Sequence, residues 1–221
     1  MNTFSNKPIM LAIESAIEGG SLALFIRDAL ISSIAGDQDV SRAADLLPNI
    51  DQLLSSNGRA PGDLGLIAVS RGPGSYTGIR IGIATALGLA RSIGVPCVGI
   101  SALEALGLAG PSDREIITAI PVGREDVAWQ RFGRGREPLD TPGIGKAADL
   151  YTVVRDHPGH QLVCHSGVLA RLPAAGNAGI DAFDAGRDIA LLIGRATLQG
   201  GSANSLSPIY LLNPARNRGL F

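Results

Sequence analysis

The chain of 221 residues has little charge, few aromatic residues and almost no cysteine. Charged residues make up 18% of it, and 19 Lys+Arg against 20 Asp+Glu leave a formal net charge of −1. This balance argues against a protein that holds nucleic acid by its own electrostatics, because phosphate binding relies on clustered Lys and Arg. Cys97 and Cys164 are too few for a disulfide framework and indicate reduced thiols in a cytosolic protein.

The chain also lacks a long hydrophobic run. Its most apolar stretch, 79–90, is short and contains Arg80, whereas a membrane span needs about 18 apolar residues. Glu14 interrupts the apolar part of the N-terminus too early for a signal peptide. We therefore expect a soluble, cytoplasmic protein without membrane contact. Apolar residues nevertheless amount to 45%, so we expect a folded chain that covers some apolar surface with a partner.

The hydrophobic pattern predicts an α/β protein with mixed sheets. The first half reads as strands at 8–14, 21–27, 29–35, 64–70 and 95–100, with helices at about 39–57 and 77–93. We expect Asp37 or Asp39 to cap the first helix, Pro48 to kink it and Gly58 to end it. A similar order of strands and helices recurs more weakly in the second half. It predicts strands at 115–120, 126–132 and 161–164, a loop at 133–145 and helices at 147–155 and 185–199. This recurrence predicts two lobes, 1–104 and 105–221, with the late helix able to pack back on the first.

The most informative stretch is SRGPGSYTGIRIG, residues 70–82. Gly72 and Gly74 flank Pro73 in a tight turn, and Ser75 or Thr77 is placed to cap the helix that follows. Such a turn is able to cradle a phosphate on its N–H groups. Its G-x-G-x-x-x-G spacing matches neither the dinucleotide fingerprint nor the P-loop, which favours a structural turn and leaves the phosphate site as the alternative.

Two rows of residues with helical spacing follow the turn. Gly78, Gly82 and Ala86 form a row of small residues, and a second row of large apolar residues consists of Ile79, Ile83 and Leu87. Glycine inside a helix costs about 1 kcal/mol relative to alanine, so a helix that contains several needs a reason. We expect that reason to be the close approach of another helix.

The stretch 70–82 resembles the hallmark of the TsaB (YeaZ) family of tRNA threonylcarbamoyladenosine biosynthesis proteins. Shorter matches support the resemblance, namely SAIEGGSLAL at 15–24, Leu46-Leu47-Pro48, VPCVGISA at 95–102 and SPIYL at 207–211. The chain departs from the family pattern at Glu14-Ser15, where relatives usually have Asp-Thr. The resemblance implies an actin-like ASKHA (ribonuclease H-like) fold of two lobes.

The resemblance also implies a non-catalytic subunit without a cofactor. Such a subunit docks and supports a TsaD-like threonylcarbamoyltransferase, which modifies N6 of adenosine 37 in tRNA. A TsaE-like ATPase joins the larger complex, the chain forms a homodimer when alone, and tRNA is contacted only through the complex. TsaD-like relatives hold a metal with a His-x-x-x-His helix, and this pattern does not occur here.

The family's helix pair implies a partner-binding set. Its members are Leu46, Leu47, Ile50, Gly78, Ile79, Gly82, Ile83, Ala86 and Leu87. We expect Gly82→Leu, or a charge at Ile83, to abolish the heterodimer without unfolding the chain. The residues of the motif turn form a second set with possible nucleotide contact: Glu14, Ser15, Gly72, Pro73, Gly74, Ser75, Tyr76, Thr77 and Arg80.

Two other functions remain open at this point. One is a small ASKHA nucleotide-binding enzyme or ATPase that uses Glu14, Ser15 and the glycine turn, although the Asp-x-Gly-Thr phosphate loops of that class are missing. The other is a diverged homodimeric paralogue. The segment HPGHQLVCH, residues 157–165, offers ligand types suited to zinc, but its Pro-Gly favours a turn followed by a strand. We predict no catalytic residue, and no nucleophile motif accompanies the three histidines.

Overall fold

The computed structural model describes residues 9–17, 19–35, 42–172, 180–201 and 206–211. Its first half forms a five-stranded sheet in the order β3-β2-β1-β4-β5. The central strand β1 pairs antiparallel with β2 and parallel with β4, with Ala12 opposite Ala68. The elements of this half are β1 (Ile9–Glu14), β2 (Ser21–Ile26), β3 (Ala29–Ala35), α1 (Arg42–Ser56), a 3-10 turn (Pro61–Asp63), β4 (Leu66–Ser70), α2 (Tyr76–Ile93) and β5 (Cys97–Ile100).

The second half repeats this topology. Its sheet has the order β10-β9-β6-β7-β8, and its central strand β6 again pairs antiparallel with one neighbour, β7, and parallel with the other, β9. The elements are α3 (Ala102–Gly107), β6 (Ile116–Val122), β7 (Asp126–Phe132), β8 (Gly143–Lys146), α4 (Ala147–Asp156), β9 (Gln161–Cys164), α5 (Ser166–Leu169), β10 (Ala182–Asp184) and α6 (Ile189–Leu198). Two mixed sheets of one topology confirm the expected actin-like fold.

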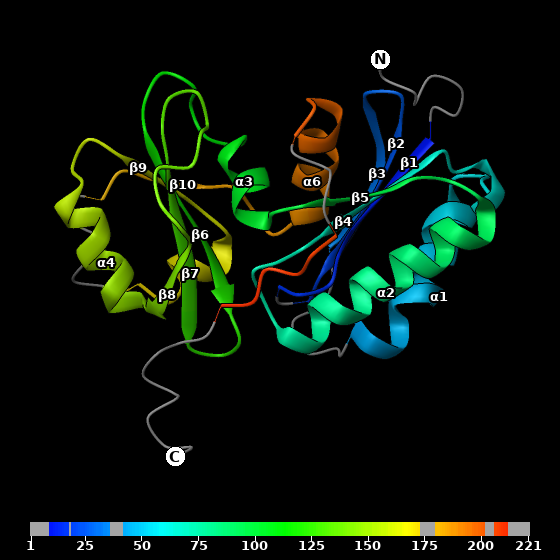
Figure 1. The fold of residues 1–221 in the computed structure, drawn as a ribbon, viewed down its shortest axis with the longest axis horizontal. Coiled ribbons are helices and arrows are strands. Elements are labelled where there is room, and N and C mark those ends of the chain that lie inside the picture. The colour runs from blue at the N-terminus through cyan, green and yellow to red at the C-terminus, as the bar shows by residue number, and fades with distance from the viewer. Residues whose placement is uncertain (1–8, 18, 36–41, 173–179, 202–205, 212–221) are drawn as a thin grey trace.

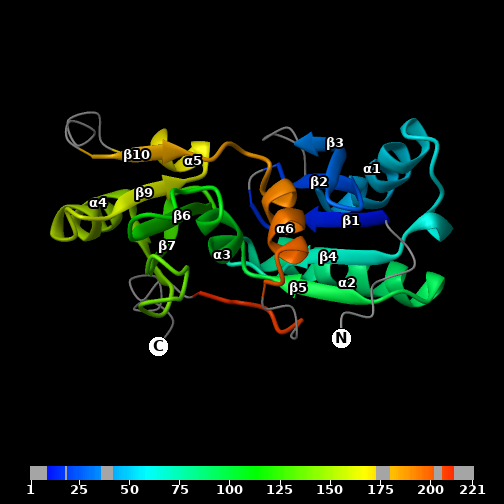
Figure 2. The same cartoon turned by 90° about the horizontal axis from the view of Figure 1, so that it is seen from above.

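The molecule is a stack of layers, which Figure 1 shows from α4 at the left to α1 and α2 at the right. The alternation of side chains along β1 builds the right-hand layers. Leu11 and Ile13 face the core under α1 and α2, whereas Met10 and Ala12 face a central core shared with α3, α6 and the second sheet. Figure 2 shows α6 across the first sheet from α2. The late helix therefore packs on the first sheet although it comes from the end of the chain.

Besides the 3-10 turn, four elements lie where the pattern predicted none. The edge strands β8 and β10 have four and three residues, α3 occupies the stretch that follows β5, and the short helix α5 follows β9. The late helix begins at Ile189 instead of residue 185, after the cap residue Asp188. Short edge strands are defined by the neighbour they pair with, which a local pattern does not report. The expected caps Asp37 and Asp39 lie outside the described residues.

Candidate functional site

The glycine turn packs on the end of β1. The Gly72-Pro73 peptide is cis, and Gly72 has a positive φ of 94°. Ser75 caps α2, because its Oγ accepts a hydrogen bond from the Gly78 N–H at 3.3 Å. The Ser75 N–H donates to the Ala16 carbonyl at 2.7 Å. This N–H group is therefore used within the chain and is not directed at a phosphate site.

The row of small residues on α2 faces the same place, which corrects the expected partner contact of Gly78 and Gly82. A Cβ on Gly78 would lie 2.3 Å from the Ser15 carbonyl oxygen, and one on Gly82 would lie 2.3 Å from Ser15 Oγ. Ser15 Oγ donates to the Gly78 carbonyl at 2.9 Å. The glycines thus permit a close approach, but of the turn that follows β1 in the same chain.

Glu14 is directed back into its own turn. Its side chain is buried, and Oε1 accepts hydrogen bonds from the N–H groups of Ala16 and Ile17, the latter at 2.9 Å. A magnesium ion or a phosphate at this position would compete with these bonds. The geometry of Glu14 and Ser15 therefore favours a structural role in the turn over the nucleotide alternative.

The predicted partner-binding residues divide between the core and the surface. Five of them are at most 9% exposed and belong to the core between the helices and the first sheet: Leu46, Ile50, Ile79, Ile83 and Ala86. These five are corrected to core residues, because each helix turns its broadest apolar stripe toward the sheet. Leu47 is 59% exposed and Leu87 is half-buried, so these two remain available to a partner.

A second face of α2 points away from the sheet. Ala84 and Gly88 are exposed there, Ile81 and Thr85 are half-buried, and α1 beside them exposes Leu47. A Cβ on Gly88 would meet no atom within 4 Å. The residues Leu47, Ile81, Ala84, Thr85 and Gly88, none of them charged, are called the outer face below. Among the described residues, nothing packs against Gly88 in a way that requires a glycine there.

A cluster of two tyrosines and one arginine lies at the start of α2. The Arg80 guanidinium stacks 3.9 Å from the centre of the Tyr76 ring, and its Nε donates to the Tyr210 hydroxyl at 3.2 Å. The rings of Tyr76 and Tyr210 are 4.7 Å apart. The hydrogen bond to Tyr210 raises the pKa of Arg80 above its usual value. The sequence contains the SPIYL match but no local signal for this contact, because the contact joins residues 130 positions apart.

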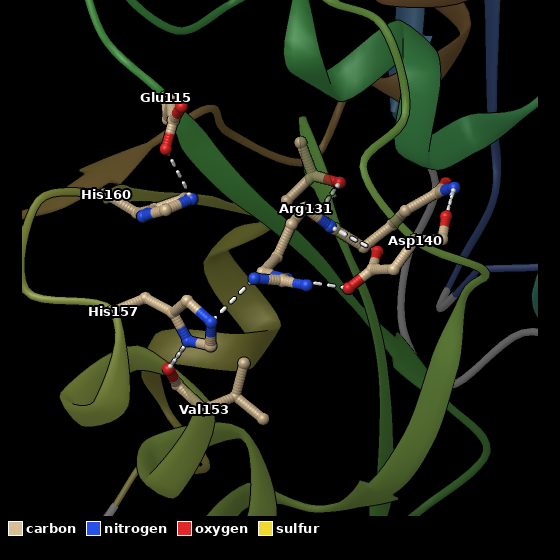
Figure 3. A network of polar contacts seen from close by, with 8 residues as sticks. Glu115, Arg131, Asp140, Val153, His157 and His160 are labelled. Carbon is tan, nitrogen blue, oxygen red and sulfur yellow. Dashed lines mark hydrogen bonds and ion pairs between the residues drawn. The ribbon is translucent and has the colours of Figure 1, made fainter. Parts of the chain in front are cut away.

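The histidine segment forms a turn followed by β9, as predicted, and its rings bond to the chain itself (Figure 3). His157 Nε2 lies 2.6 Å from an Nη of Arg131, and Arg131 Nε donates to Asp140 at 2.7 Å. His160 Nε2 lies 3.1 Å from the Glu115 carboxylate. Among the described residues, no three His, Cys, Asp or Glu side chains are grouped so as to hold a metal ion.

His165 is buried at the end of β9. Its Nδ1 accepts a hydrogen bond from the Gly167 N–H at 2.9 Å. Within the part of the chain that the structure describes, none of the three histidines hydrogen-bonds a serine, threonine or cysteine side chain. The described residues therefore present no histidine-activated nucleophile of the kind a serine or cysteine hydrolase needs. In the described ranges, no helix has the length and apolar character of a bilayer span.

Comparison with known proteins places this geometry in a tRNA-modification context. The family model described as TsaD, tRNA N6-adenosine threonylcarbamoyltransferase, matches residues 40–163, more than half of the chain. The tRNA threonylcarbamoyladenosine biosynthesis protein TsaB of Escherichia coli is 28% identical over 69% of this chain and 64% of its own length. TsaB of Bacillus subtilis is 36% identical over 46% of this chain and 44% of its own length. The chain thus spans less than two thirds of these curated relatives.

The fold also matches a solved structure. A Pseudomonas aeruginosa protein described as similar to peptidase YEAZ superposes with a TM-score of 0.65. It is 22% identical, and the match covers 92% of this chain and 99% of that one. At this identity the likeness establishes the shared fold and carries no statement about peptidase activity.

Proposed function

This chain belongs to the TsaB (YeaZ) family of tRNA threonylcarbamoyladenosine biosynthesis proteins, and we propose that it is a non-catalytic subunit that docks and supports a TsaD-like threonylcarbamoyltransferase. The tRNA product is N6-threonylcarbamoyladenosine at position 37. Without that subunit, two copies of the chain would pair through the same surface. A TsaE-like ATPase would join the larger complex, and tRNA would be contacted through it.

The observation that carries the proposal is the outer face of α1 and α2. Gly88 at its centre opens into free space, where glycine costs helix stability without any packing gain inside the chain. Small residues at Ala84 and Gly88 let a partner helix approach closely, while Leu47 and Ile81 supply apolar area to bury. A helix pair from another subunit would use both features.

The contacts of the histidines, Glu14 and Ser15 favour a non-catalytic role over a transferase role. Its three histidines occupy one short segment, and each is engaged by neighbouring groups of the second half. Glu14 and Ser15 are used to fasten the turn after β1 to α2. Among the described residues, the outer face has no comparable role inside the chain, which supports protein contact as its function.

The proposal is tested by the affinity of the full chain for the TsaD subunit of the same organism. Ala84→Glu places a charge on the outer face, and Ala148→Glu is the matched control, since Ala148 is also an exposed helical alanine but lies on α4. We expect Ala84→Glu to weaken the one-to-one complex about tenfold or more, because burying an unpaired charge is costly. Ala148→Glu should bind like the unaltered chain.

The masses of the complexes are measured by light scattering, and circular dichroism checks that both variants keep their fold. Equal affinities for the two variants would place the contact elsewhere. A chain that forms no complex with the folded TsaD subunit would contradict the proposal itself. In that case, titration with ATP and magnesium would test the nucleotide-binding alternative.

A further inference from the structure

We infer that Arg80 is a specificity-determining residue of the docking surface, which binds a carboxylate of the TsaD-like subunit while Tyr76 and Tyr210 hold its guanidinium in place. This inference rests on the proposed function and deepens it. It adds a charged residue to the docking surface. It also assigns a positioning role to residues 206–211, which are called the C-terminal segment below.

The C-terminal segment is fastened beside the glycine turn. The Ile209 N–H donates to the Arg71 carbonyl at 2.8 Å, and Arg71 Nη1 donates to the Ser207 carbonyl at 3.3 Å. Leu206 packs against the core beneath α1 and α2. Figure 1 shows this segment in red, running between the two halves of the molecule. These contacts place Tyr210 against the first turn of α2.

Tyr210 and Tyr76 together restrain an otherwise flexible side chain. Tyr76 supplies a stacking surface at 3.9 Å, and the Tyr210 hydroxyl accepts the Nε–H bond that sets the plane of the guanidinium. Two of the chain's three tyrosines are used here. A guanidinium restrained in this way loses less conformational entropy when it binds a ligand than a free arginine loses.

The end of that guanidinium is free to bind. Arg80 is exposed, and in the described ranges neither Nη1 nor Nη2 has a hydrogen-bond acceptor, and no carboxylate forms an ion pair with it. The planar pair of nitrogens matches the two oxygens of a carboxylate in a bidentate contact. Arg80 is thus a restrained cation without a counterion among the residues that the structure describes.

The position of Arg80 favours a protein carboxylate as the ligand. Arg80, Ala84 and Gly88 follow at intervals of four residues, so they lie in one row along α2, and a partner seated on the outer face reaches all three. A phosphate site would call for several convergent cations. Here the nearest one along the chain, Arg71, is already engaged with Ser207, and the exposed residues Ser75 and Thr77 are uncharged.

The test measures the dissociation constant of the full chain and the TsaD subunit of the same organism for five variants, the fifth being Tyr210→Phe. Arg80→Gln removes the charge, Tyr210→Ala removes the support, and the third variant combines the two. Arg195→Gln is the matched control, because Arg195 is an exposed helical arginine on α6, across the first sheet from α2. We expect Arg80→Gln to weaken binding about tenfold, more at low salt than at high salt.

Tyr210 should act only through Arg80. Tyr210→Ala is expected to weaken binding about threefold in the unaltered background and to add nothing once Arg80 is glutamine, since coupled residues are not additive. Tyr210→Phe, which keeps the ring and loses the acceptor, should fall between tyrosine and alanine. Equal losses from Tyr210→Ala in both backgrounds would contradict the positioning role.

The outcomes separate this inference from the proposed function. If Ala84→Glu disrupts the complex while Arg80→Gln binds within twofold of the unaltered chain, docking stands and the Arg80 anchor is wrong. If Arg80→Gln leaves subunit affinity unchanged but lowers retention of tRNA by the assembled complex, the ligand is a phosphate and the inference is overturned. If the unaltered chain forms no complex, both fail, because the carboxylate belongs to that partner.

Discussion

At the scale of single residues, His165 is the clearest case of a side chain controlled by its surroundings. It is fully buried, and burial, followed by the nearby charge of Arg187, lowers the pKa of its imidazole from 6.5 to about 4. The Gly167 N–H donates to Nδ1, which requires the neutral ring. The folded chain therefore holds His165 uncharged at pH values where an exposed histidine begins to take up a proton.

This predicts a loss of stability in mild acid. Between pH 6.5 and pH 4 the unfolded state binds a proton at position 165 that the folded state does not bind, so the free energy of unfolding falls as the pH falls. Between pH 7.5 and pH 5 the contribution of His165 is about 2 kcal/mol. Urea unfolding at both pH values measures it, and His165→Gln should show a correspondingly smaller difference. An unchanged difference would mean that His165 ionises normally in the fold.

At the scale of elements, α2 is a helix with two packing faces. Gly78 and Gly82 lie against Ser15, Ile83 is only 9% exposed, and Gly88 opens into free space. Gly82→Leu or a charge at Ile83 would therefore disturb the chain's own core. These two substitutions are therefore unsuitable as tests of docking, contrary to the expectation from the sequence. The substitution Ala84→Glu on the outer face replaces them.

The two faces predict opposite effects for one substitution. Gly88→Ala should raise the free energy of unfolding by up to about 1 kcal/mol, because alanine favours the helix and meets nothing. Gly78→Ala should lower it by roughly 1–3 kcal/mol, because its Cβ would lie 2.3 Å from the Ser15 carbonyl oxygen. Urea unfolding of the two variants measures both changes. Equal signs would mean that the faces of α2 are assigned wrongly.

At the scale of the whole molecule, the halves share one central core. That core combines side chains from the inner faces of both sheets with those of α3 and α6. Gly194 of α6 lies close to β2 in this core, since a Cβ on it would lie 2.2 Å from the Phe25 ring. The late helix α6 thereby packs on the first sheet, which is formed by the beginning of the chain. We therefore expect the two halves to unfold cooperatively.

Gly194→Ala tests this cooperativity. We expect it to lower the free energy of unfolding by roughly 1–3 kcal/mol, because the core at Phe25 has no room for a methyl group. The only tryptophan, Trp129, lies in β7 of the second sheet, so its fluorescence reports on the other half. Fluorescence and circular dichroism should give the same lowered midpoint. Gly159→Ala, with nothing within 4 Å, is the neutral control. A Trp129 transition that does not move would show that the halves unfold independently.

The sequence by itself determined the central strands, the long helices and the family. Buried strands such as Ile9–Glu14 and the glycine turn at 70–82 carry their signal in consecutive residues, where alternation and backbone freedom are local properties. The same is true of the start of α2 at Tyr76, which a serine cap defines within three residues. These features were predicted because no distant residue is needed to form them.

Only the tertiary structure decided which face of each element meets which neighbour. Gly78 and Gly88 look alike in the sequence, but the turn after β1 lies beside Gly78, whereas no described residue lies beside Gly88. The strands β8 and β10 exist through their pairing with β7 and β9, and the Arg80–Tyr210 contact joins residues 130 positions apart. Helical periodicity defines an apolar stripe but not its partner, because the partner is brought there by the folding of the rest of the chain.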